Sequence, residues 1–173
     1  MLGAALPLVG TAGPASASPW PWPSGTAKAA ELTATDGGRQ AFGWATAVTA
    51  DGNTALIGAP SRDSDTGAAY LFAHTYSGWR QTTELTASDG AKNDLFGSSV
   101  AITPDGNAAL VGAPSHDRAG AAYLFTRTPV GWQQTAELTA SDAASDDAFG
   151  TSVAITPDGN AALVGAPSKI EWA

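Results

Sequence analysis

The chain has 173 residues, of which 43% are hydrophobic and 14% charged, so it is long enough to form one globular domain with a substantial core. Its net charge of −8 argues against nucleic acids and anionic membranes as partners, because binding to either requires basic patches. Cysteine is absent, which excludes a disulfide framework and cysteine-ligated metal clusters. The 20 glycines and 11 prolines favour short strands joined by many turns.

The first 17 residues form an apolar stretch of small residues that ends in Ala15-Ser16-Ala17, a sequence like a signal-peptidase site. A basic region is missing from this stretch, since the first lysine is Lys28. We interpret 1–17 as a signal-peptide-like leader of a secreted or cell-surface protein, the alternative being a disordered leader. The stretch is too short to span a bilayer, which takes about 20 apolar residues. Residues 18–29, rich in proline and tryptophan, are predicted to be a linker.

Three copies of one unit follow, at 30–82, 83–135 and 136–168, and a tail at 169–173 departs from the repeat. Glu31, Glu84 and Glu137 open the three copies at intervals of 53 residues. Each copy contains Glu-Leu-Thr-Ala, then Phe-Gly, then Gly-Ala-Pro, and the first two copies continue with Gly-Ala-Ala-Tyr-Leu-Phe and Gly-Trp. A fixed period of this order is typical of solenoids, propellers and arrays, in which each unit needs a neighbour to bury its faces.

The second copy predicts four strands, at 97–103, 108–113, 120–127 and 132–140. A turn at 104–107 and a polar loop at 114–119 separate the first three. No segment has helical periodicity, so the expected unit is a four-stranded antiparallel meander and the expected class is all-β.

Both faces of the predicted sheet are apolar. Tyr123 and Phe125 point to one side of their strand, and Ala122 and Leu124 point to the other. Stacking of successive sheets covers both faces, whereas a sandwich with one wet face would alternate apolar and polar residues. Small residues in the first strand and large ones in the third and fourth suit the wedge-shaped blades of a β-propeller.

The copies predict an incomplete propeller of about 2.75 blades. The third copy stops after its second strand, and Glu31–Thr35 is expected to be a fourth strand without a blade, which gives roughly eleven strands. Closed propellers have about four to eight blades. We therefore expect either a fragment of a longer propeller or a protomer that closes by oligomerising, with self-association through its open blade faces.

The Phe-Gly pair followed about 16 residues later by Gly-Ala-Pro resembles the FG-GAP repeat of integrin α-subunit propellers and of bacterial secreted proteins. The bacterial form is the closer likeness, because it shares Glu-Leu-Thr-Ala-Ser-Asp before the Phe-Gly and Gly-Ala-Ala-Tyr-Leu-Phe after the Gly-Ala-Pro. The resemblance covers 31–168. It implies a propeller, usually of seven blades, that acts in adhesion or ligand binding outside the cell. The implied partner is an extracellular protein or a glycan that the sequence does not identify.

The calcium loop of integrin-type repeats is largely missing here. Asp105-Gly106 matches the centre of that loop, but the other ligand positions fall on Ala101, Thr103 and Ala109. Calcium needs six to eight oxygen ligands, so one carboxylate per loop does not suffice. We therefore expect no cofactor and interpret the three equivalent aspartates as turn formers. These are Asp51, Asp105 and Asp158.

Two acidic loops are weak candidates for cation binding, although solvated loop charge is the favoured interpretation. Their candidate ligands are Asp63, Asp65, Asp142 and Asp146.

Nothing in the pattern predicts catalysis. His74 and His116 stand where other copies have Arg127 and Arg62, so neither occupies a position that the repeat keeps as histidine. We predict a non-catalytic binding or adhesion module.

Trp79 and Trp132 recur at the start of the fourth strand and are the candidate ligand-binding residues, because an exposed tryptophan can stack on a sugar ring. This supports the alternative of a sugar-binding lectin assembled from short chains. Strand alternation places each tryptophan on the side of Leu85 or Leu138, which favours packing between blades. It places Glu84 and Glu137 on the other side, facing solvent or a cross-strand threonine.

Overall fold

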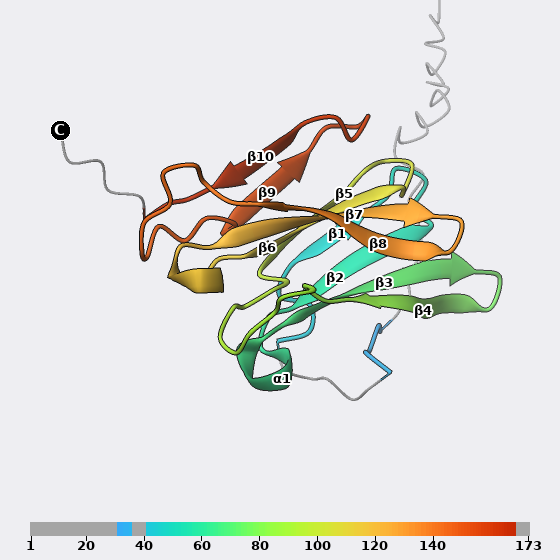
Figure 1. Cartoon of the computed structure of the whole chain (residues 1–173). Coiled ribbons are helices and arrows are strands. Elements are labelled where there is room, and N and C mark those ends of the chain that lie inside the picture. Colours follow the sequence, from blue (N-terminus) through green and yellow to red (C-terminus); the bar gives the residue numbers. More distant parts are fainter. Residues whose placement is uncertain (1–30, 36–40, 169–173) are drawn as a thin grey trace, which may run out of the picture.

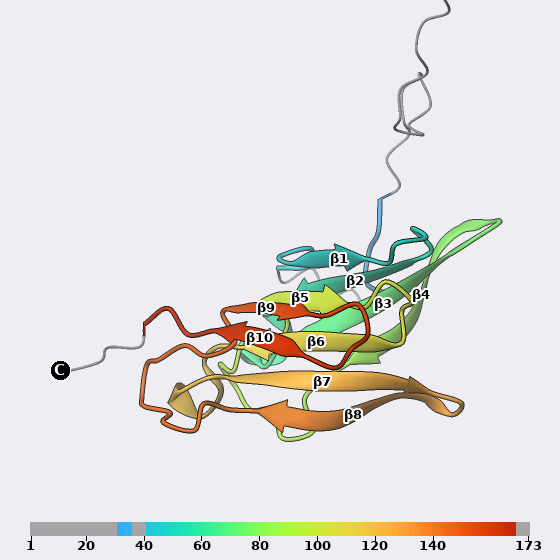
Figure 2. The ribbon, with the colours of Figure 1, turned by 90° about the horizontal axis from the view of Figure 1, so that it is seen from above.

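A computed structural model describes residues 31–35 and 41–168, which form three antiparallel sheets stacked face to face (Figures 1 and 2). The all-β expectation and the four-stranded meander are confirmed. The first sheet has the order β1-β2-β3-β4, with strands Thr46–Val48, Thr54–Ala59, Ala68–Thr75 and Gly78–Leu85. The second has the order β5-β6-β7-β8, with strands Ser99–Ile102, Ala108–Ala113, Ala121–Thr128 and Gly131–Leu138. The third pairs β9, Ser152–Ile155, with β10, Ala162–Gly165.

The expected strand at Glu31–Thr35 is wrong, and the described residues contain ten strands rather than eleven. A strand needs a hydrogen-bonded neighbour. Instead, the backbone N–H of Thr35 donates to the Gln81 side-chain oxygen at 2.9 Å, and Leu32 and Ala34 pack on the outer face of the first sheet. The segment thus covers a sheet face without joining a sheet. The predicted leader, linker and tail lie outside the described residues.

Two single-turn helical segments occupy the loops between the second and third strands of the full sheets. They are α1, Arg62–Asp65, and η1, His116–Arg118. The sequence predicted these loops but not their turns. Asp63 and Ser64 have φ of 49° and 61°, a left-handed conformation that short polar side chains tolerate better than most. Among the described residues, no helix is long and apolar enough to cross a membrane.

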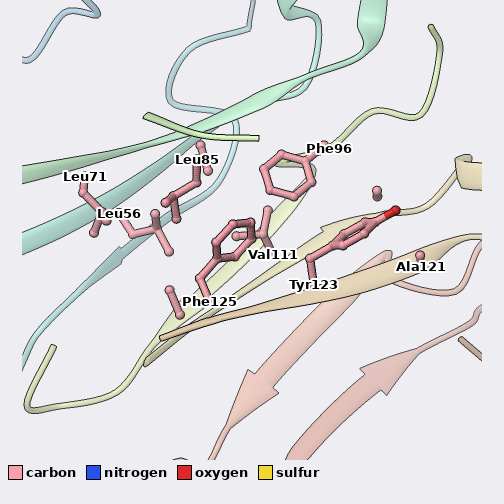
Figure 3. Packing of buried hydrophobic residues seen from close by; sticks show 11 residues of the cluster. Leu56, Leu71, Leu85, Phe96, Val111, Ala121, Tyr123 and Phe125 are labelled. Carbon is pink, nitrogen blue, oxygen red and sulfur yellow. The ribbon is translucent and has the colours of Figure 1, made fainter. Parts of the chain in front are cut away.

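The core lies between the first and second sheets. Leu56 and Leu71 of the first sheet face Val111, Tyr123 and Phe125 of the second (Figure 3). Phe96 of the Phe-Gly motif is fully buried between them, with its ring centroid 5.6 Å from that of Tyr123 and 5.9 Å from that of Phe125. Phe42 makes the same contacts with Tyr70 and Phe72 at 5.6 and 6.0 Å. The motif phenylalanine therefore covers the aromatic face of the sheet that follows it.

A β-bulge in the third and fourth strands overturns the predicted orientation of the tryptophans. In the first sheet the register shifts between Leu71 and Phe72, and in the second between Leu124 and Phe125. The extra residue reverses strand alternation. As a result Trp79 packs in the outer cluster of the first sheet, whereas Leu85 lies in the core on its inner face.

Glycines of the repeat motifs bring the backbones of successive sheets into direct contact. A Cβ on Gly58 would lie 2.0 Å from the Gly97 carbonyl oxygen, and one on Gly67 would lie 2.0 Å from the Phe96 oxygen. Gly67 and Phe96 form a parallel bridge, which Gly120 and Phe149 repeat. The Phe-Gly and Gly-Ala-Pro motifs are thus the two halves of one backbone contact between sheets, which only residues without a side chain can make.

Replacement of Gly58 by alanine tests this contact. Because the residue lies in a strand outside the left-handed region, the cost of Gly58→Ala arises from the clash, and we expect the free energy of unfolding to fall by about 3 kcal/mol. The matched control is Gly52→Ala, where φ is +69° but no atom lies within 4 Å, with an expected loss of about 1 kcal/mol. Urea denaturation followed by tryptophan fluorescence measures both. Equal losses would contradict the proposed role of the contact.

Candidate functional site

One edge of the stack carries the loops that differ most among the copies. These are the loops between second and third strands, 61–66 and 114–119, and the links between sheets, 89–98 and 142–148; together we call them the loop edge. In an antiparallel meander these connections necessarily lie on one side, and the hairpins β3–β4 and β7–β8 lie on the other. Figure 1 shows α1 and the β6–β7 loop at the left and those hairpins at the right.

Backbone hydrogen bonds fix the loop edge. The N–H groups of Leu95 and Phe96 donate to the carbonyl oxygens of Asp65 and Thr66 at 2.8 and 3.0 Å. In the next copy, Asp146 and Phe149 donate to Arg118 and Ala119 at 2.6 and 2.9 Å. Each link is therefore held against the loop of the preceding sheet, so side chains that are distant in sequence keep a defined spacing.

His116 is the centre of a buried polar cluster on this edge. It is 6% exposed, and its Nδ1 lies 2.8 Å from a carboxylate oxygen of Asp94, which is 5% exposed. The same Asp94 oxygen accepts the Ala91 N–H at 2.8 Å. Around Nε2 lie carboxylate oxygens of Asp117, Glu137 and Asp89, at 3.6, 3.7 and 3.8 Å.

The charges of this cluster act on the histidine. Burial by itself lowers the pKa of His116, but the hydrogen bond with Asp94 and the charges of Asp94, Asp89 and Asp117 together outweigh it and leave the pKa raised. The cluster therefore favours a cation at this position. Asp89 and Glu137 are 41% and 36% exposed, so solvent reaches the Nε2 side of the ring.

Tyr123 extends the cluster into the core. It stands opposite Glu137 in the β7–β8 pair, and its hydroxyl points away from Leu56 and Leu71 (Figure 3). The hydroxyl is buried and makes no hydrogen bond of ordinary geometry among the described residues. Burial first, then the charge of Asp89 and a weak hydrogen bond to it, and then the charges of Glu137 and Asp94 raise the pKa of Tyr123 far above its usual value. The hydroxyl is thus a neutral donor directed at carboxylates.

The first sheet has a different cation in the equivalent place. Arg62, the counterpart of His116, lies with a guanidinium nitrogen 3.3 Å from a carboxylate oxygen of Glu84 and also pairs with Asp63. Glu84 stands opposite Tyr70, as Glu137 stands opposite Tyr123. Both glutamates keep part of their surface exposed to solvent, as expected, and each in addition lies near the basic side chain of its own sheet, because both stand at the loop-edge ends of β4 and β8.

A hollow of about 580 Å³ lies beside this cluster on the loop edge. Lys92 and Arg118 line it together with Asp94, Asp117 and Asp146. Both basic side chains are exposed. The hollow thus offers charged groups of both signs, an arrangement suited to a polar ligand rather than an apolar one.

The predicted tryptophans do not belong to the loop edge. Trp132 is half-buried against the core between the first and second sheets, as the packing interpretation predicted. Trp79 is half-buried on the outer face of the first sheet, with its ring centroid 5.1 Å from that of His74. It lines a second hollow, of about 530 Å³, with Leu32, Thr35 and Gln81.

The four acidic candidates lie on the loop edge, but on two different loops. Asp63 pairs with Arg62, and Asp65 offers its backbone oxygen to Leu95. Asp146 lines the first hollow. Among the described residues, the acidic and basic side chains that converge on one point are instead Asp89, His116 and Glu137, whose ligand atoms all lie within 4.8 Å of one another.

The three hairpin aspartates build turns, as predicted. The Thr49 hydroxyl donates to Asp51 at 2.6 Å and the Asn53 N–H donates to the same carboxylate at 3.0 Å, and these hydrogen bonds lower the pKa of Asp51. Asp105 and Asp158 repeat the arrangement with their own threonine and asparagine neighbours.

The sequence did not single out His116 or Glu137. The histidine has no counterpart in the other copies, so the repeat does not mark it. The available signal was that Arg62 is replaced by His116 while the glutamate, Glu84 or Glu137, is the same in both copies. Asp89 and Asp94 lie on another connection, and only the folded loops bring them to the ring.

The chain was compared with known protein families and with curated proteins. The family model of the FG-GAP repeat matches residues 26–72, 79–125 and 132–171, one match for each copy. No curated protein matches the chain. FG-GAP repeats fold into β-propeller blades, in agreement with the stacked four-stranded sheets. Because these matches cover well over half of the sequence, the chain belongs to the FG-GAP repeat family.

Proposed function

We propose that the chain is a non-catalytic, extracellular binding or adhesion module whose loop edge contacts its partner. FG-GAP repeats are typical of integrin-like propeller binding modules and occur in extracellular and cell-surface proteins. The observation that carries the proposal is the combination of a rigid repeated scaffold with one variable, charged edge. Binding residues are commonly found on loops positioned by such a scaffold.

The hollow beside Asp94 and Asp117 is the proposed contact point. Its lining of exposed basic and acidic side chains suits a polar partner, either a protein or a glycan with charged groups. The glycine contacts and the hydrogen bonds of Leu95 and Phe96 hold the edge in place before binding. Little conformational entropy is then lost on association, which favours affinity.

A binding assay on immobilised extracellular proteins tests this proposal. We expect saturable binding of the purified chain to at least one protein of the panel, and loss of that binding in the double variant Lys92→Glu/Arg118→Glu, because both side chains line the hollow. The matched control is Tyr76→Ser, since Tyr76 is fully exposed on the opposite hairpin edge. Binding that survives the double variant, or that Tyr76→Ser abolishes equally, would contradict the loop edge as the binding surface.

The hollow beside Trp79 supports a second candidate, a sugar-binding lectin. The indole ring, the Gln81 amide and the Arg80 side chain line it together, and this combination of an aromatic face with hydrogen-bonding groups suits a sugar ring. The inner tryptophan, Trp132, lines a smaller hollow of about 220 Å³ between sheets.

A glycan array separates the two candidates. A lectin would show saturable glycan binding that Trp79→Ala abolishes while the loop-edge variant Lys92→Glu/Arg118→Glu retains it. A loop-edge binding module would show the reverse pattern. Circular dichroism of each variant confirms that the sheets remain folded, so that loss of binding reports on the site.

We also propose that the chain self-associates through the open face of its third sheet. Leu163 on β10 is 75% exposed, whereas its counterparts Leu56 and Leu110 in the first and second sheets are fully buried. Covering an exposed leucine contributes roughly 2 kcal/mol.

Size-exclusion chromatography with light scattering checks this. We expect a concentration-dependent mass above that of one chain, reduced toward one chain in Leu163→Gln. The control is Val130→Gln, because Val130 is 84% exposed but lies in the β7–β8 turn rather than on a sheet face. A single-chain mass for the unaltered protein at all concentrations would overturn the proposal.

A further inference from the structure

The polar cluster around His116 has the features of a metal site. In the neutral imidazole one ring nitrogen donates a hydrogen bond and the other carries a lone pair. The contact of Nδ1 with the Asp94 carboxylate, at 2.8 Å, requires the proton on Nδ1. The lone pair of the neutral ring is then on Nε2 and points toward Asp89 and Glu137. Metal-binding histidines usually have such a carboxylate on the nitrogen that does not bind the metal.

The spacing around Nε2 suits a small cation. The Asp89 and Glu137 oxygens lie 3.8 and 3.7 Å from Nε2, beyond hydrogen-bond distance. Metal–ligand bonds of about 2.0–2.2 Å in a tetrahedral site place ligand atoms about 3.4 Å apart. The two separations from Nε2 exceed this by a few tenths of an ångström, and all three ligand atoms lie within 4.8 Å of one another, so side-chain rotations can bring them together. Asp117, with an oxygen 3.6 Å from Nε2 and an exposed side chain, stands within reach of a fourth position.

The Tyr123 hydroxyl is an independent indication of a ligand. It is completely buried, makes no hydrogen bond of ordinary geometry among the described residues, and has the Asp89 carboxylate as its nearest acceptor, through a weak hydrogen bond. A buried hydroxyl without a well-formed hydrogen bond destabilises the fold. A metal-bound carboxylate or water held at Asp89 gives this donor an acceptor, because ligating carboxylates are themselves hydrogen-bonded.

Comparison with the first sheet shows which charge is missing. There a permanent cation, Arg62, occupies the position of His116 and lies 3.3 Å from Glu84. In the second sheet the imidazole supplies at most one positive charge against four carboxylates, those of Asp89, Asp94, Asp117 and Glu137. A divalent cation at Nε2 would supply positive charge beside Glu137, as the guanidinium does beside Glu84 in the first sheet.

We propose that the second sheet binds a divalent transition-metal ion, zinc in the first instance, through Nε2 of His116 and the carboxylates of Asp89 and Glu137. Imidazole with carboxylates suits zinc and its neighbours, whereas calcium prefers six to eight oxygen ligands. The two carboxylates are partly exposed, which gives the ion a path from solvent. Asp94 is a positioning residue, since it touches the imidazole but not the metal position.

Zinc titration of the chelator-treated full chain against a chromophoric competitor tests the proposal. We expect one saturable site per chain. The variants His116→Gln, Asp89→Asn and Glu137→Gln each remove a ligand and should weaken zinc binding about tenfold or more, and Asp94→Asn should weaken it about tenfold through the lost orientation of the ring. The matched control is His74→Gln, an exposed histidine beside Trp79, which should leave the affinity unchanged.

Two further measurements keep the test sharp if His116→Gln folds poorly. Glu137→Gln changes a partly exposed residue, so its fold should persist and its thermal midpoint should no longer rise with zinc. Cobalt in place of zinc should give the intense visible absorption of a tetrahedral site in the unaltered chain and not in that variant. Absence of saturable zinc binding, equal affinity of Glu137→Gln and the unaltered chain, or loss of binding in His74→Gln would each overturn the proposal.

Discussion

The fold depends most on the close contact between the backbones of neighbouring sheets. A Cβ on Gly112 would fall 2.0 Å from the Gly150 oxygen, as one on Gly58 would from Gly97, so the approach repeats from sheet to sheet. At the contact between Gly112 and Gly150, the Ser99 hydroxyl also donates a hydrogen bond to the Gly150 carbonyl oxygen at 2.7 Å. Because interiors are close-packed, this approach fixes both the separation of the sheets and the depth to which Phe96 inserts between them.

That constraint also explains why function is concentrated on one edge. The backbone contacts leave the face positions little freedom, whereas the loops between second and third strands differ in length by one residue and carry Arg62 in one copy and His116 in the next. Substitution there alters charge and chemistry without disturbing the aromatic and aliphatic packing of the faces. A repeat fold of this kind separates what holds the structure together from what contacts a partner.

The sequence predicted the parts of the fold that depend on local patterning. The span 108–113 coincides with β6, and the turn chemistry of Asp51, Asp105 and Asp158 followed from the Asp-Gly-Asn sequence that all three share. It failed where a single inserted residue matters. The bulge at Leu124/Phe125 interrupts the alternation within β8, so simple alternation wrongly placed Trp132 on the side of Leu138 and opposite Glu137. A bulge has no reliable signature in one sequence, because it depends on the pairing of two strands.

The polar cluster lay beyond sequence reasoning for a related reason. Asp89 and Asp94 come from the link before β5, His116 from η1 and Glu137 from β8, and nothing in their spacing places them together. What the repeat does show, once the fold is known, is a substitution at one equivalent position: Arg62 neutralises Glu84 directly, whereas His116 leaves a lone pair and surplus carboxylates at the same place. Like charges that gather at one point repel one another unless a cation lies among them. An external cation is therefore expected in the second copy, where His116 replaces the permanently charged arginine of the first.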